Sequence, residues 1–160
     1  MIHSWQNSLI LLIATVPGLM ISTRRRVIFR EMRTFSRELS GRLRAPLLPV
    51  LAELVSDNVV ASPEEQTETT IRNLADLAVL LESRTDIGYC LRRSLVRFYF
   101  LRRAGIPVVI HVGASHSIRE GTELVDGHAW LTLEDQPYFE LHKNLDSFVV
   151  MLSFPEHDAM

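Results

Sequence analysis

The chain has 160 residues, of which 47% are hydrophobic and 22% charged, so it can bury one ordinary core and hardly two. We therefore expect a single domain spanning residues 1–160. The formal net charge of -2 excludes the strongly basic balance typical of nucleic-acid binders, and seven Gly with seven Pro are too few for a disordered chain.

The single cysteine, Cys90, excludes an internal disulfide and the thiolate cluster of a structural zinc site. This cysteine usage indicates a reducing compartment or a reactive thiol, so we expect a cytoplasmic protein. Neither a Gly-rich phosphate loop nor a dinucleotide fingerprint is present, and we expect no cofactor.

An apolar run covers residues 9–21 and is followed at once by Arg24, Arg25 and Arg26. It is shorter than the roughly 20 residues that span a bilayer. It has no basic leader before it and no small-residue cleavage site after it, unlike a secretory signal. The pattern favours a buried or interfacial helix over a membrane anchor.

Eight of the seventeen basic residues fall between positions 24 and 44. The same stretch places Ile28, Met32, Phe35 and Leu39 on one helical face before Gly41 ends it. Such a basic amphipathic helix can lie on anionic lipid, dock an acidic partner, or be a core helix with a solvated face. The sequence leaves these alternatives open.

Two further helices are predicted before the cysteine. A short apolar helix follows Pro46 and Pro49, and a long helix starts at the capping signal of Ser62, Pro63 and Glu65 and ends near position 84. The apolar face of the long helix comprises Ile71, Leu74, Ala78 and Leu81.

The pattern then changes from helix to strand. A buried helix over 90–104 is predicted to stop at Gly105. Strands are predicted at 107–112, 128–133 and 138–141, with a loop at 113–127 and a turn at 134–137. Helices followed by an antiparallel sheet indicate the α+β class.

Three residues on adjacent predicted elements could perform nucleophilic catalysis. Cys90 opens a helix, where amide groups and the macrodipole stabilise a thiolate. His128 starts a strand that would hold a base rigidly, and Glu140 on the next strand would orient the imidazole. Trp130 either walls this site or packs in the core. Taken singly, a lone cysteine or histidine is more often structural.

The order of several short motifs resembles a known family. Cys90-Leu91-Arg92-Arg93-Ser94-Leu95, then residues 101–106 (LRRAGI), then Val112-Gly113 and His128-Ala129-Trp130 are similar to the transglutaminase-like leader peptidases of lasso-peptide biosynthesis. The resemblance implies a papain/transglutaminase-like core with Cys90 as nucleophile and His128 as base. The family's third catalytic residue is an aspartate twelve positions after the histidine, where this chain has Glu140; Asp135 and Asp146 rank below it.

The resemblance also implies partners and a division of the chain. Members of the family often carry a winged-helix leader-recognition module, whereas residues 1–84 read as helical here. The likeness therefore implies the protease-only form, with a helical extension at 1–61 and the catalytic core at 62–160. The expected partners are the precursor peptide, a separate leader-recognition protein and the lasso cyclase, and the N-terminal segment is a candidate for docking to them or to the inner membrane surface.

Two other functions fit the same residues. A transglutaminase or acyltransferase would pass the acyl group to an amine instead of water. A scaffold that binds a peptide without cutting it would also fit, since Glu140 departs from the family's aspartate. A metal site built from Cys90, His128 and Glu140 lacks any close-spaced ligand pair and is disfavoured.

Overall fold

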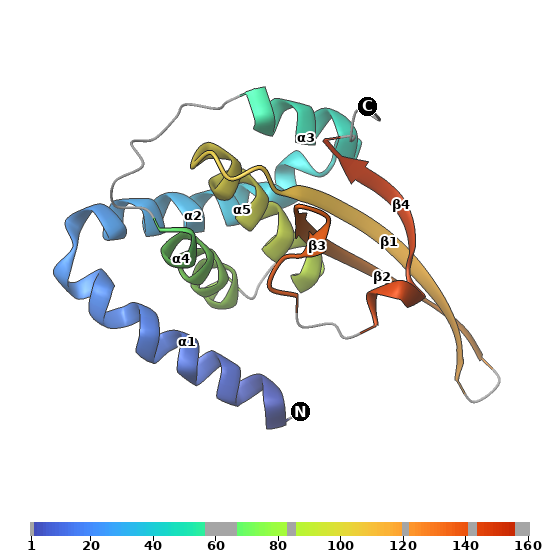
Figure 1. The fold of residues 1–160 in the computed structure, drawn as a ribbon, viewed down its shortest axis with the longest axis horizontal. Helices are drawn as coiled ribbons and strands as arrows, with labels where there is room; N and C mark the ends of the chain where they lie inside the picture. The colour runs from blue at the N-terminus through green and yellow to red at the C-terminus, as the bar shows by residue number, and fades with distance from the viewer. Residues whose placement is uncertain (1, 57–66, 83–85, 120–121, 141–143, 156–160) are drawn as a thin grey trace.

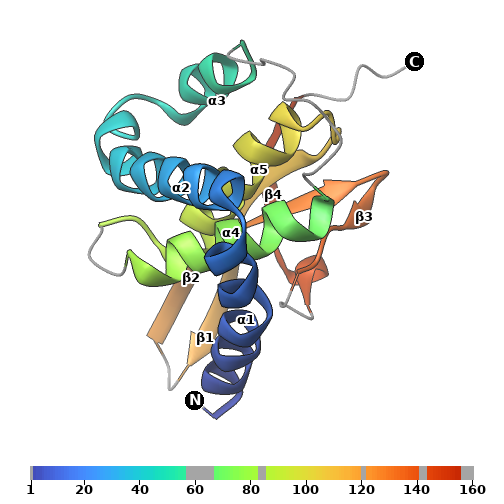
Figure 2. The same ribbon diagram turned by 90° about the vertical axis from the view of Figure 1, so that its left-hand side faces the viewer.

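The computed structural model describes residues 2–56, 67–82, 86–119, 122–140 and 144–155. These residues form helices packed against one antiparallel sheet, with the helical layer on one side of the molecule and the sheet on the other (Figures 1 and 2). The predicted α+β class is confirmed.

The helices follow the predicted order. Their bounds are α1 (Ile2–Ile21), α2 (Thr23–Arg42), α3 (Leu47–Ser56), α4 (Glu68–Leu81) and α5 (Tyr89–Arg103). The hydroxyl of Thr67 caps α4 by accepting the Thr70 amide at 3.2 Å. The predicted capping signal at Ser62, Pro63 and Glu65 lies outside the described residues. No helix in the described part of the chain is long and apolar enough to cross a membrane.

The core lies among α2, α3, α4 and α5 and continues to the sheet, which α5 contacts through β1 and β2. Met32, Phe35 and Leu39 of α2 are buried as their spacing predicts, and Phe35 stacks on Tyr99 of α5 with ring centroids 4.5 Å apart. Leu81, at the end of α4, is half exposed and does not belong to the buried face. Helix α5 ends at Arg103, and Gly105 follows its C-cap with a φ of 80° that suits glycine, so Gly105 stops the helix as predicted.

The sheet has the strand order β3-β2-β1-β4. Its strands are β1 (Val109–Arg119), β2 (Thr122–Leu133), β3 (Gln136–Pro137) and β4 (Val149–Phe154), and each neighbouring pair is antiparallel. Gly113 of β1 faces His128 of β2 in the register. β4 lies at one edge beside β1, and the short β3 lies at the other (Figure 1).

Two expectations for the sheet were wrong, and one strand was missed. The loop expected at 113–127 is instead the long hairpin of β1 and β2, so His116 lies on a strand. The strand expected at 138–141 is β3 at 136–137, because Glu134 and Asp135 adopt φ of 51° and 60° and form a two-residue turn. β4 was not predicted at all.

Candidate active site

Helix α5 carries Cys90 in its first turn. The first amide to donate along this helix is that of Arg92, which reaches the Gly88 carbonyl at 3.1 Å. The amides of Tyr89, Cys90 and Leu91 therefore precede the helical ladder and point out of the helix end. The half-buried Cys90 Sγ lies 4.0 Å from the carbonyl oxygen of Gly127, the residue before His128. The thiol thus faces the strand that carries the imidazole.

A buried hydrogen bond fixes α5 against β2 close to this thiol. The Ser94 hydroxyl donates to the Ala129 carbonyl at 2.8 Å, and both residues are almost fully buried. Ser94 is one helical turn after Cys90, and Ala129 directly follows His128. Helix α5, which carries the thiol, and strand β2, which carries the imidazole, are therefore joined by a hydrogen bond close to both groups.

Aromatic rings hold His128 from the side. Its ring stacks on Trp130 with centroids 5.9 Å apart at 15° and meets Phe148 at 5.3 Å. Gly113, opposite His128 on β1, leaves room for this arrangement, because a Cβ there would lie 3.0 Å from the Trp130 ring and 2.8 Å from the Val149 carbonyl oxygen. Trp130 does wall the imidazole, and Phe148 is a wall residue that sequence reasoning missed.

Glu140 lies beside the imidazole, although no strand carries it. Its Oε1 is 3.5 Å from Nε2 of His128, longer than an ordinary hydrogen bond, and the two side chains are only 4% and 10% exposed. Phe139 directs the chain here through a left-handed φ of 47°, a conformation unfavourable for a bulky residue. The alternative acids, Asp135 in the turn and Asp146 in the short 3-10 helix Leu145–Ser147, are exposed.

Arg93 holds Glu140 from α5. Its Nη2 donates to both carboxylate oxygens at 2.9 Å, and its side chain is 5% exposed. The pairing of Arg93 with Glu140 was not predicted from the sequence. Arg92 points elsewhere, donating to the backbone carbonyls of Val79 at 3.2 Å and of Glu82. Burial lowers the pKa of Arg92.

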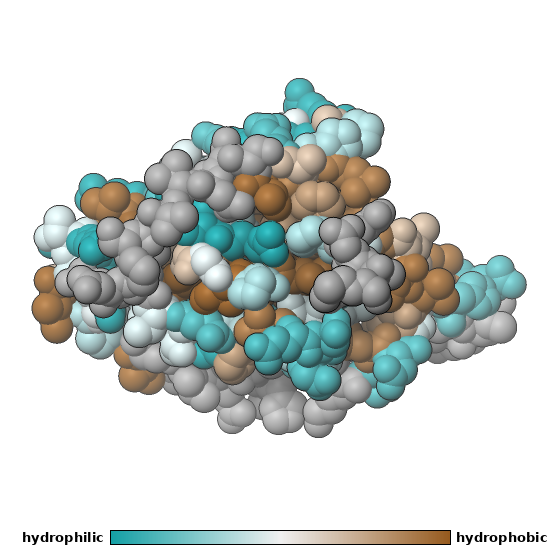
Figure 3. Space-filling view, turned by 45° about the horizontal axis from the view of Figure 1, so that its top comes forward, coloured by the Kyte–Doolittle hydropathy of each residue, from teal (hydrophilic) through white to brown (hydrophobic). Residues whose placement is uncertain are grey.

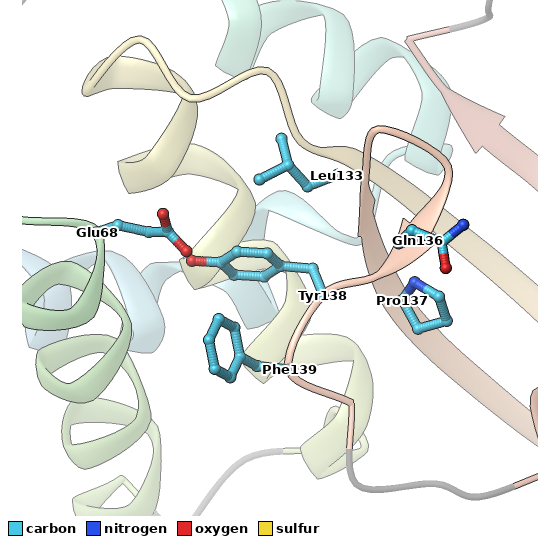
Figure 4. A pocket seen from close by; sticks show the side chains of 6 residues that line it. All are labelled: Glu68, Leu133, Gln136, Pro137, Tyr138 and Phe139. Carbon is cyan, nitrogen blue, oxygen red and sulfur yellow. The ribbon is translucent and has the colours of Figure 1, made fainter.

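A cavity of about 380 Å³ opens next to the segment that leads to Glu140 (Figure 4). It lies between the start of α4 and the β2–β3 turn, and its lining residues are Glu68, Leu133, Gln136, Pro137, Tyr138 and Phe139. Burial, followed by the Glu68 carboxylate, raises the pKa of Tyr138. The lining includes neither the thiol nor the imidazole, so this cavity is not the reaction centre.

Two other histidines have contacts within the sheet. His111 bonds Ser153 at 2.8 Å and Thr132 at 2.9 Å through its two ring nitrogens, and His116 lies 3.7 Å from Glu123 on the exposed hairpin. His142 and His157 lie outside the described residues. Across the ranges that the structure describes, no group of three or more His, Cys, Asp or Glu side chains is arranged to hold a metal ion.

Comparison with known proteins places this arrangement in a family. The family model described as the transglutaminase-like superfamily matches residues 30–153, from within α2 to β4, and so covers Cys90, His128 and Glu140. Members of this superfamily are typically enzymes of the cysteine-protease type, with peptidase or acyl-transfer chemistry. No curated protein and no solved structure matches the chain. The chain belongs to the transglutaminase-like superfamily.

Proposed function

We propose that this protein is a cysteine peptidase that removes the leader from a ribosomally made lasso-peptide precursor. The observation that carries the proposal is that the Cys90 sulfur faces the carbonyl preceding His128, while Glu140 lies behind that imidazole. The order of the Cys-Leu-x-Arg and His-Ala-Trp motifs supports the lasso-peptide assignment.

The proposed reaction passes through an acyl-enzyme. Nε2 of His128 faces Glu140, so Nδ1 is the atom that takes the thiol proton. The Cys90 thiolate attacks the scissile carbonyl carbon, and the first-turn amides of α5 hold the oxyanion. When the C–N bond breaks, His128 protonates the leaving amine. Water, deprotonated by His128, then hydrolyses the thioester, which releases the leader's new carboxylate and restores the thiol.

Glu140 takes the place of the family's aspartate in this proposal. A glutamate has one more methylene, so its carboxylate needs a second contact to keep one position behind the imidazole. Arg93 supplies that contact from the helix that also carries Cys90. The 3.5 Å separation between Glu140 and His128 is expected to shorten once substrate orders the site.

The proposed partners follow from the shape of the N-terminal half. The described residues before Val109 are helical and contain no strand, unlike a winged-helix leader-recognition module. A separate leader-recognition protein is therefore proposed to deliver the precursor, and the lasso cyclase is proposed to receive the freed core peptide. The proposed location is the cytoplasm.

The decisive experiment combines the purified chain with the precursor peptide and the leader-recognition protein from the same gene cluster, and follows cleavage by mass spectrometry. Cys90→Ala and His128→Ala should abolish cleavage. His116→Ala, which changes an exposed histidine on the hairpin, is the matched control and should cut normally. Cleavage that persists in Cys90→Ala would refute the proposal.

The same reaction distinguishes hydrolysis from acyl transfer. With an added primary amine, a peptidase still yields a leader ending in a free carboxylate, whereas an acyltransferase yields the amide. The alkylation rate of Cys90 by iodoacetamide at neutral pH tests the peptide-binding scaffold. A rate no higher than that of a free thiol, together with no cleavage, would favour that scaffold.

A further inference from the structure

In the part of α1 from residue 11 to 21, the outer face is apolar and exposed even though the inner face already packs on the protein. Thr15 is buried and Leu19 packs against the core, while α1 contacts α4 and α2. On the outer face the exposed fractions are 66% for Ile13, 76% for Met20 and 85% for Ile21. An apolar helix face that solvent reaches usually has a partner.

The charged residues of α1 and of the first turns of α2 have one sign. Residues 1–30 contain four arginines and no aspartate or glutamate. Arg24, Arg26 and Arg30 are exposed on the first turns of α2, together with Val27, which is 56% exposed. The first acidic residue of the chain, Glu31, forms an ion pair with Arg103. The partner of this face should therefore be anionic.

The bend between the helices brings the apolar and basic groups together. Ser22 ends α1 and caps α2 by accepting the Arg25 amide at 3.3 Å. The Arg25 side chain folds back over Gly18, where a Cβ would collide with its guanidinium. Figure 1 shows α1 on the outside of the helical layer, and Figure 3 shows hydrophobic surface at the left-hand end of the molecule, where α1 and α2 meet.

We infer that the second half of α1 and the first turns of α2 form a docking surface for an anionic lipid membrane. The apolar side chains enter the boundary between headgroups and acyl chains, and the arginines pair with lipid phosphates. The protein lies on the membrane through this surface, consistent with the absence of a spanning helix among the described residues. α1 precedes the family match at 30–153, and the inference does not depend on the proposed peptidase activity.

Vesicle flotation with the full chain tests this surface. Vesicles of phosphatidylglycerol and phosphatidylcholine should bind the protein at least tenfold more tightly than phosphatidylcholine alone, and 0.5 M salt should remove that preference. Arg26→Gln with Arg30→Gln should weaken binding ~25-fold, which is ~5-fold, or ~1 kcal/mol, for each arginine. Met20→Ser with Ile21→Ser should weaken it at least tenfold.

The matched control is Val149→Ser with Met151→Ser, an exposed apolar pair on β4 far along the chain from α1, which should bind like the wild type. Circular dichroism should show the same fold for every variant. Equal binding to neutral vesicles, or no binding to either kind, would overturn the inference. So would a dimer in light scattering that Met20→Ser with Ile21→Ser abolishes while no vesicle binds, because the occupant would then be a second copy of the chain.

Discussion

Removing Arg93 should leave the Glu140 carboxylate buried without the guanidinium that holds it. Both side chains are at most 5% exposed, so water cannot replace the lost contact. Breaking a buried pair by removing one partner costs ~3–5 kcal/mol. This is a large share of the 5–15 kcal/mol by which domains are typically stable. We expect Arg93→Met to lower the melting temperature by ~6–20 °C.

A double-mutant cycle separates the pair from ordinary packing loss. Replacing both charges, in Arg93→Met with Glu140→Met, removes two desolvation costs along with the attraction, so the double variant should be much closer to wild type than Arg93→Met alone. Urea unfolding followed by circular dichroism gives the free energy of unfolding of Arg93→Met, of Glu140→Met and of the double variant, each relative to wild type. If the two single effects simply add, the pair is not coupled and the reasoning is wrong. Arg93→Lys keeps the charge and should retain most of the stability.

The same variant tests the role of Arg93 in positioning the acid. Cys90 alkylation per folded molecule should fall at least tenfold in Arg93→Met and recover in part in Arg93→Lys. The matched control is Met32→Ala, which removes a fully buried side chain of α2 and should cost a similar ~2–5 kcal/mol. If Met32→Ala slows alkylation as much as Arg93→Met does, Arg93 acts only through stability.

Three further changes probe other contacts. Ser94→Ala leaves the buried Ala129 carbonyl without its donor, and should cost ~1–3 kcal/mol in urea unfolding and slow Cys90 alkylation; an unchanged midpoint would contradict this. Gly113→Ala forces a Cβ against the neighbouring strand and an indole ring, so it should cost ~1–3 kcal/mol and shift tryptophan fluorescence, whereas an unshifted spectrum would argue against the close approach. Hydrogen bonding from Arg37 lowers the pKa of Glu82, so this carboxylate stabilises the fold above its ordinary pKa of 4.5 and loses that effect as pH falls through the lower folded value. Glu82→Gln should therefore be less stable than wild type by up to ~1 kcal/mol at pH 7, and the difference should shrink as the pH falls below the ordinary pKa of Glu82; a difference that did not shrink in acid would contradict the pKa direction.

The helices could be predicted from sequence because apolar residues recur every three to four positions on the buried face of a helix, whatever that face packs against. Met32, Phe35 and Leu39 show this, since their spacing alone identifies the buried face of α2. The long hairpin could not be predicted in the same way. Gly113 and Gly127 look like turn residues, yet they lie within strands, where Gly113 makes room for an indole ring.

The candidate site likewise has parts that local sequence indicates and parts that it does not. Cys90 and His128 could be proposed from the sequence because local patterns predict a helix start at one and a strand at the other, and the structure places them there. The contact between Arg93 and Glu140 spans 47 positions, and Phe148 reaches His128 from a segment without periodicity. Such contacts depend on how elements pack together, so spacing along the chain does not predict them.

Helix α5 shows what a search for apolar periodicity overlooks. Cys90, Arg93, Ser94 and Arg97 follow the spacing i, i+3, i+4, i+7 and so share one face of the helix. Cys90 approaches the Gly127 carbonyl, and Arg93 binds the Glu140 carboxylate. Ser94 donates to the Ala129 carbonyl, and Arg97 donates to the Phe139 carbonyl.

That face is polar and mostly buried, which is costly unless its groups are satisfied. Hydrogen bonds are directional where apolar contacts are not, so a rotation of α5 that moved the thiol would break three buried polar contacts together. The position of Cys90 is therefore set by the same contacts that hold Glu140 and β2. Under the proposed function, a glutamate can act where the family has an aspartate, because Arg93 on the helix that carries Cys90 also holds the Glu140 carboxylate.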